Sequence, residues 1–167
     1  MTARLKGKDL EILALLQKDC KATARQIADQ TGSPISTVFA RIRRLEKTGV
    51  IKGYRAVLDS KKLQSGTTAF ILASVSYGTR SNEKMISQRS TAQEIARFPE
   101  VQEVHIITGD WDVLIKVKAK NVDTVGKFVI DKLRFVKGIE KTLTCMVFET
   151  CKETTDIPIE TRKNFSV

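Results

Sequence analysis

The chain has 167 residues, of which 41% are hydrophobic and 29% charged, and its formal net charge at pH 7 is +10. That length allows one medium domain or two small ones, each with a modest core. No apolar run approaches the roughly 18 residues that a membrane span needs, and the first ten residues lack the apolar core of a signal peptide. We therefore expect a globular cytoplasmic protein without a membrane partner.

The positive charge is concentrated at the start of the chain. Residues 1–63 carry 14 Lys and Arg against 6 Asp and Glu, whereas residues 64–167 carry 15 against 13. A basic first third before a near-neutral remainder indicates that the first third meets a polyanion. Nucleic acid fits better than an anionic membrane surface, because no basic amphipathic helix here has a large aromatic apolar face.

Three helices are predicted in this basic third, over residues 8–18, 23–31 and 35–47. Thr23 and Gln26 have the spacing of a capping box at the start of the second helix. Gly32 can take the left-handed conformation that ends a helix, and Pro34 fits just inside the start of the next one. Two helices joined by such a short break indicate a helix-turn-helix.

The helix predicted over residues 35–47 has two contrasting faces. Ile35, Val38, Ile42 and Leu45 share an apolar face. The opposite face is small and hydroxylic at its N-terminal end and cationic towards its C-terminal end, which suits a recognition helix in the major groove. The alternative is a surface helix with a solvated basic face. The DNA-facing residues predicted on this helix are Ser36, Thr37, Ala40, Arg41, Arg43, Arg44 and Lys47.

Residues 50–58 follow as two short β-prone pieces around Gly53, the pattern of a wing. A wing would bring Lys52 and Arg55 to the DNA backbone, where they would position the protein without reading sequence. A plain connecting hairpin is the alternative. Residues 59–68 are polar and flexible in composition and are predicted to be a linker.

Beyond residue 68 strands alternate with helices. We predict strands over residues 69–76, 101–108, 112–119 and 139–148, and helices over residues 82–98 and from Asn121 onward. The order βαββαβ is that of a ferredoxin-like split sandwich, so the fold class is α+β. Helices cover one face of such a sheet, yet the first strand is apolar on both faces, which predicts a second subunit packed sheet to sheet. Core candidates on the helices are Met85, Ile86, Ile95, Ala96, Val122, Val125, Val129 and Leu133.

Candidates for catalysis or metal binding are few. Cys20, Cys145 and Cys151 are odd in number and lack a paired CxxC spacing, so neither a zinc site nor a disulfide framework is expected. His105 is the only histidine, and a buried or interfacial structural role is expected for it rather than one beside a nucleophile. The sequence contains no phosphate loop with its lysine. We predict no catalytic residue, no metal and no cofactor.

Three segments carry a resemblance to a known family: LEILALLQKD (residues 10–19), STVFARIRRLEKTGVIKGYRAVLD (36–59) and VQEVHIITGDWDVLIKV (101–117). The chain resembles the leucine-responsive regulatory protein family (Lrp/AsnC, the feast/famine regulators) over residues 5–150. The resemblance implies a winged helix-turn-helix (1–58), a linker (59–68) and a ferredoxin-like domain (69–150) that senses ligands and dimerises, often with assembly into tetramers or octamers. Residues 151–167 extend beyond the pattern, and their end is expected to be disordered or to reach a neighbouring subunit.

The resemblance also assigns residues to the two sites. It places Ser36, Thr37, Ala40 and Arg41 at the base-reading end of the recognition helix, with Arg43 and Arg44 as backbone contacts. Where many relatives have Gly-Leu-Ser before that helix, this chain has Gly32-Ser33-Pro34, which leaves the capping contact open.

The effector region of the family falls on Gly109, Asp110 and Asp112, with Thr142 and Thr144 as polar lining. A glycine turn exposes amides for an α-carboxylate, and two carboxylates can meet an α-ammonium group. The alternative is a hairpin whose Asp side chains bond its own amides.

We therefore predict a sequence-specific transcriptional regulator, cytoplasmic and nucleoid-associated, that binds pseudo-palindromic double-stranded DNA as a dimer or larger homo-oligomer. An amino acid is the expected effector of its DNA affinity or assembly. One alternative is an enzyme like the sirohaem decarboxylases, which resemble this family in both domains, but a single histidine argues against it. The other is an amino-acid-binding regulatory subunit that acts through protein contacts, and the charge of +8 on residues 1–63 speaks against that.

Overall fold

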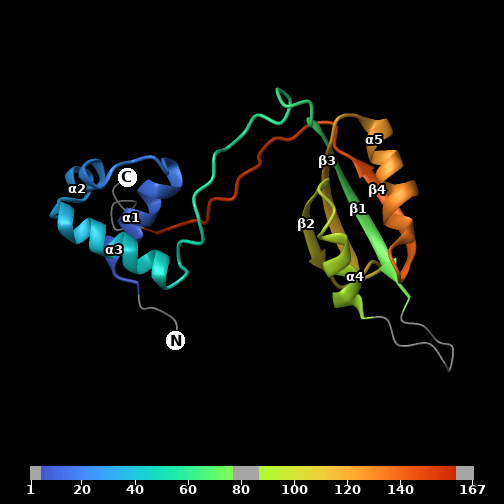
Figure 1. Cartoon of the computed structure of the whole chain (residues 1–167), viewed down its shortest axis with the longest axis horizontal. Helices are drawn as coiled ribbons and strands as arrows, with labels where there is room; N and C mark the ends of the chain where they lie inside the picture. Colours follow the sequence, from blue (N-terminus) through green and yellow to red (C-terminus); the bar gives the residue numbers. More distant parts are fainter. Residues whose placement is uncertain (1–4, 77–86, 161–167) are drawn as a thin grey trace. The chain divides into compact units, whose positions relative to one another are not determined.

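The computed structural model describes residues 5–76 and 87–160, and the chain divides into two compact units (Figure 1). Of the described residues, the first unit contains 5–57 and 153–160, and the second contains 58–76 and 87–152. The first unit is helical and the second is an antiparallel sheet with helices. The predicted α+β class is confirmed.

The first unit is built from three short helices, α1 (Gly7–Lys18), α2 (Ala24–Thr31) and α3 (Ile35–Lys47). All three agree with the helices predicted from the sequence within one residue at each end. Each helix turns an apolar face towards a common centre, and together these faces form a closed core. The buried residues of this core are Ile12, Leu16, Ile27, Ala28 and Val38.

Helix α2 begins and ends with the capping signals that the sequence predicts. The hydroxyl of Thr23 accepts a hydrogen bond from the Gln26 N–H at 3.3 Å, and the Gln26 side chain accepts one from the Thr23 N–H at 2.8 Å. Gly32 has a φ of +62°, in the left-handed region, and ends α2. Pro34 is the N-cap of α3, one residue earlier than predicted, and its carbonyl accepts from the N–H groups of Thr37 and Val38.

Two predictions for the first unit were wrong. Ile35 is half exposed rather than buried with Val38, because it is the first residue of α3 and lies at the edge of the core. The expected wing hairpin is not formed, since no residue of the described stretch 50–58 is in a strand. The two pieces do not pair because they are held on α3 instead: the N–H of Ile51 donates to the Leu45 carbonyl at 3.1 Å, and the Tyr54 hydroxyl donates to Glu46 at 2.9 Å.

The second unit has a four-stranded sheet in the order β2-β3-β1-β4, with all neighbours antiparallel. Its strands are β1 (Thr67–Val75), β2 (Val101–Ile106), β3 (Val113–Ala119) and β4 (Ile139–Met146). Helix α4 (Gln88–Ile95) follows β1, and α5 (Val122–Lys127) follows β3 and continues as a π-helical turn (Phe128–Lys132) and a 3-10 turn (Leu133–Phe135). The βαββαβ order predicted from the sequence is confirmed.

Both helices of the second unit lie on one face of the sheet (Figure 1). The strand residues that face them alternate with residues of the opposite face. That opposite face, which we call the helix-free face, carries Phe70 and Leu72 of β1, with Leu114 opposite Leu72 on β3 and Leu143 opposite it on β4. The core under the helices consists mainly of Ala69, Ile71, Ala73, Val113, Ile115, Val117, Ile95, Val125, Phe128, Val129 and Leu133.

Two residues predicted for the helical core of this unit are exposed instead. Val122 is 63% exposed because it is the first residue of α5, directly after the Asn121 cap. Ala96 is exposed just after the last turn of α4. Among the described residues helix α4 begins at Gln88, and the predicted start at Asn82 lies outside them, as do Met85 and Ile86.

Residues 153–160 return to the first unit of their own chain, which the sequence did not predict. The Gln17 side chain on α1 donates to the Ile157 carbonyl at 2.9 Å and accepts from the Ile157 N–H at 2.9 Å. A single amide side chain thereby reproduces the paired hydrogen bonds that two antiparallel strand residues make. Gln17 is therefore the residue that holds this segment on α1.

We expect Gln17→Ala to release the 153–160 segment without unfolding α1. Each of the two hydrogen bonds contributes about 1 kcal/mol, so hydrogen exchange at the Ile157 amide should accelerate by about fivefold or more. Exchange measured by mass spectrometry would check this, with Gln93→Ala, an exposed position of the second unit, as the control. An unchanged exchange rate at Ile157 in Gln17→Ala would contradict the assignment.

Candidate functional site

The basic face of α3 is anchored to a buried carboxylate on α1. The Asp9 side chain is fully buried, and its two oxygens accept from Arg41 and from Arg44, each at 2.7 Å. The same carboxylate accepts from the N–H of Lys6 at 2.8 Å and so caps α1. One carboxylate thus joins two helices and fixes the direction of two arginines. Sequence reasoning missed Asp9, although an acid in the first turn of a helix in a strongly basic segment was a usable signal.

The ionisation of Asp9 follows from its partners. Burial alone would raise the pKa of this carboxyl, but the hydrogen bonds from Lys6, Arg41 and Arg44 outweigh burial and lower the pKa. A lowered pKa in the folded state means that the stabilisation is present above the unfolded-state pKa of about 3.9. It is lost as the pH falls through the folded-state pKa.

We expect Asp9→Asn to destabilise the first unit by about 2 kcal/mol. Removing one member of a fully buried ion pair costs about 3–5 kcal/mol, and the cost here is smaller because both arginines keep contact with water. The wild-type protein should also lose stability below about pH 4, and the Asn variant should lose less over the same range. Urea unfolding at pH 7 and pH 3 measures both effects. Equal pH dependence in the two proteins would contradict the role given to Asp9.

Five of the seven DNA-facing residues predicted on α3 lie together in the structure. They line a shallow hollow of about 430 Å³ together with Lys6 of the α1 N-terminus. Arg43 and Lys47 are exposed beside this hollow, and Lys52 and Arg55 are exposed on the extended stretch 50–58. The five residues in the hollow are Ser36, Thr37, Ala40, Arg41 and Arg44.

The chemistry of this face suits a polyanion. Two hydroxyls, a small apolar side chain and guanidinium groups can meet base edges and phosphates. The nearby Glu46 carboxylate accepts from the Tyr54 hydroxyl at 2.9 Å. Burial and this carboxylate raise the pKa of Tyr54 to about 12, so its hydroxyl remains a donor to Glu46 at neutral pH. The Glu46 carboxylate is therefore hydrogen-bonded to Tyr54 rather than directed towards the hollow.

The turn predicted to bind an effector contains two aspartates with different surroundings. Gly109 has a φ of +118°, which favours glycine. Asp112 accepts from the Val75 N–H and from the Gln88 side chain, both at 2.7 Å, and so ties the start of β3 to the end of β1 and the start of α4. Asp110 is exposed, and no hydrogen bond to it is found among the described residues. Asp112 thus has a structural role, and Asp110 remains available to a ligand.

The two threonines proposed as lining lie on β4, an edge strand. Thr142 is opposite Ala73, whose other neighbour is Val113 at the start of β3. Thr142 therefore lies at the same end of the sheet as the turn, about 10 Å from β3 at the usual strand spacing. Thr144 lies two residues further away and is exposed. The structure brings neither threonine into contact with Asp110 or Asp112.

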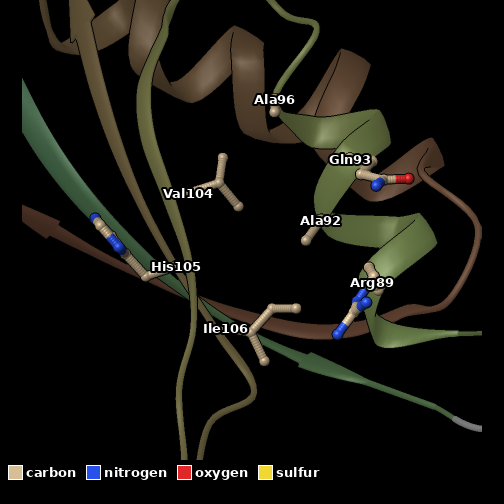
Figure 2. Close-up of a pocket in the computed structure, with 7 residues that line it drawn as sticks. All are labelled: Arg89, Ala92, Gln93, Ala96, Val104, His105 and Ile106. Atoms are coloured by element: carbon tan, nitrogen blue, oxygen red, sulfur yellow. The ribbon is translucent and has the colours of Figure 1, made fainter. Parts of the chain in front are cut away.

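A second hollow, of about 410 Å³, lies between α4 and the edge strand β2 (Figure 2). Its walls are small or apolar, with Ala92 and Ala96 facing Val104 and Ile106, and Arg89 is its only side chain of fixed charge. The residues that line it do not include the turn residues Gly109, Asp110 and Asp112.

His105 contributes to this hollow only from its strand position, because its side chain points away to the other side of β2 (Figure 2). That side chain is 54% exposed, with its Nε2 3.3 Å from Glu103. A buried position for His105 was therefore wrong, and an interfacial one stays a prediction. Hydrogen bonds from His105 and Lys116 lower the pKa of Glu103.

The described residues contain neither a candidate metal site nor a candidate membrane-spanning helix. Within residues 5–76 and 87–160, no three His, Cys, Asp or Glu side chains gather as a metal site. In the same residues, no helix has the length and apolar character to cross a bilayer.

Comparison with known proteins matches both halves of the chain. The winged helix-turn-helix DNA-binding family matches residues 5–52, and the Lrp/AsnC ligand binding domain family matches residues 68–157. An uncharacterised HTH-type transcriptional regulator of Pyrococcus furiosus is 40% identical over 153 residues, covering 92% of this chain and 99% of that protein. The leucine-responsive regulatory protein of Escherichia coli is 30% identical over 161 residues, covering 93% and 95% of the two chains.

A solved structure is similar over the whole length. It is a transcriptional regulator of Neisseria meningitidis in complex with L-Met, with a TM-score of 0.82 and 26% identity. The match covers 92% of this chain and 96% of that one. The similarity therefore includes both the helical and the sheet-containing parts.

Proposed function

The chain belongs to the Lrp/AsnC family of transcriptional regulators, and from that premise we propose how it binds DNA and what controls it. The protein binds double-stranded DNA through α3, as a two-fold assembly whose DNA affinity or oligomeric state responds to an amino acid. The observation that supports this most directly is the face of α3, where hydroxyls and arginines line one hollow and Asp9 fixes the helix from behind. Its role is regulatory rather than enzymatic, as the names of its relatives suggest.

We assign the contacts on α3 by position along the helix. Ser36, Thr37 and Ala40 occupy its N-terminal half and face base edges in the major groove. Lys47 lies at its last turn and contacts phosphate. Lys52 and Arg55 add backbone contacts from the extended stretch after α3, where their side chains are exposed.

The helix-free face of the sheet supports the proposal of a dimer. Phe70, Leu72 and Leu114 form an apolar surface there, and Leu143 beside them is 46% exposed. A second copy packed against this face would remove that surface from water and relate two α3 helices by a two-fold axis. The operator is then pseudo-palindromic, with half-sites about one helical turn or a multiple apart. Tetramers or octamers built from such dimers, and a cytoplasmic location on the nucleoid, complete the proposal.

An amino acid is the proposed effector for two reasons. The regulator of Neisseria meningitidis was solved with L-Met, and the Gly109 turn of this chain offers free backbone and an exposed carboxylate at Asp110. Asp110 can bind an α-ammonium group through a charge-assisted hydrogen bond. Thr142 is proposed as a secondary polar contact at the same end of the sheet.

We predict that Lys47→Ala weakens binding to specific and random DNA alike and reduces the slope of log affinity against log salt by about one unit. Loss of one phosphate contact has that signature because one fewer counterion is released. Ala40→Glu, which places a carboxylate at the centre of the DNA face, should abolish binding to both. Fluorescence-anisotropy titrations at salt concentrations from about 50 to about 300 mM, where phosphate contacts dominate the affinity, would measure both effects. Retained binding by Ala40→Glu would exclude α3 as the recognition helix.

We predict that Asp110→Ala removes the response to the amino acid and leaves the melting temperature unchanged, because Asp110 makes no contact that stabilises the fold. Asp112→Ala is the matched comparison: it should lower the melting temperature, since Asp112 bonds both Val75 and Gln88. A panel of the common amino acids, read out by light scattering and DNA binding, identifies the effector in the wild type. A full response in Asp110→Ala would place the ligand elsewhere.

A further inference from the structure

The three arginines of α3 are held in different ways, and this divides their roles. Arg41 and Arg44 each donate to the Asp9 carboxylate at 2.7 Å. Arg43 has no ion pair among the described residues, and its guanidinium lies over the ring of Phe39, with its central carbon 4.7 Å from the ring centre. Of the three, only Arg43 has a guanidinium held in one direction whose N–H groups do not bind a carboxylate.

Position around the helix also separates the three arginines. At about 100° per residue, Arg43 lies about 20° from Ser36 around the axis of α3, whereas Arg41 lies about 140° from it. Ser36 is exposed at the base-reading end of α3. Arg43 therefore lies on the same side of α3 as Ser36, whereas Arg41 lies on the side that contacts α1.

The stacking on Phe39 also sets the reach of Arg43. Phe39 is one helical turn before Arg43, so the guanidinium is directed back towards the N-terminal end of α3. Base contacts in a helix-turn-helix come from that end. The ring of Phe39 is 51% exposed. The exposed ring and the guanidinium above it thus lie together on the exposed surface of α3.

We propose that Phe39 and Arg43 act together as a base-reading pair, with Arg43 donating both N–H groups to the O6 and N7 of a guanine and Phe39 contacting the methyl group of an adjacent thymine. This rests on the proposed function of α3 and changes the role of Arg43 from phosphate contact to base contact. The fork of an arginine matches the major-groove edge of guanine, and phenylalanine matches the thymine methyl group. Arg41 and Arg44 keep the helix in place and contact the backbone.

The test is selection of bound fragments from random-sequence DNA by the full chain and by Arg43→Lys and Phe39→Leu. Arg43→Lys keeps the charge and loses the fork, so it should lose about tenfold to hundredfold of guanine preference at one position of each half-site. Its affinity for random DNA and its salt slope should stay within twofold of the wild type. Phe39→Leu should weaken preference at the same guanine and at the neighbouring thymine. The double variant should lose no more guanine preference than Arg43→Lys alone.

Two controls separate the possible outcomes. Arg97→Lys, the same substitution at an exposed position of the second unit, should leave the selected sequence unchanged. Both tested side chains are outside the core, and a circular dichroism melt confirms that each variant folds. If Arg43→Lys and Phe39→Leu select the wild-type sequence, the base-reading pair is overturned while the proposed function stands. If the wild type itself selects no sequence, the proposed function fails first.

Discussion

The ion pairs between Asp9 and the two arginines of α3 are the interaction on which the DNA-binding face depends. A fully buried carboxylate is costly unless every lone pair is used, and here Lys6, Arg41 and Arg44 supply the donors. The consequence is geometric. The same contact caps α1 and fixes the rotation of α3. It also holds two guanidinium groups in place, so the exposed face has one arrangement before DNA binds.

The second unit follows a different constraint, the alternation of side chains along its strands. Most residues of β1 and β3 that face α4 and α5 are buried, whereas most of their neighbours on the helix-free face are half buried, with Ser74 as a buried exception. An antiparallel sheet with polar alternation could leave that face in water, but Phe70, Leu72 and Leu114 make its centre apolar. The helices of the same chain therefore cover one face of the sheet, and in the proposed dimer a second copy covers the other face.

Much of the fold could be predicted from the sequence because its signals are local. The capping box of Thr23 and Gln26, the left-handed Gly32 and the period of each strand identify elements without reference to distant residues. One failure is local, and two involve contacts between distant residues. The 50–58 hairpin is replaced by bonds to α3, Asp9 meets arginines more than 30 residues away, and Gln17 binds a segment 140 residues away. For the same reason, the different roles of the two aspartates in the turn could not be predicted from the sequence. Only the positions of Val75 and Gln88 show that Asp112 is structural.

The two units have separate cores, and this restricts how an effector could act. The core around Ile12 and Ile27 and the core around Ile71 and Ile115 have no residue in common. The position of α3 is set within the first unit, by the core around Ile12 and Ile27 and by the ion pairs of Asp9. The chain does pass between the units twice, at residues 57–58 and 152–153, and Gln17 fastens the second of these segments onto α1. Regulation through the spacing or number of DNA-binding units fits this construction better than regulation through the shape of the recognition helix.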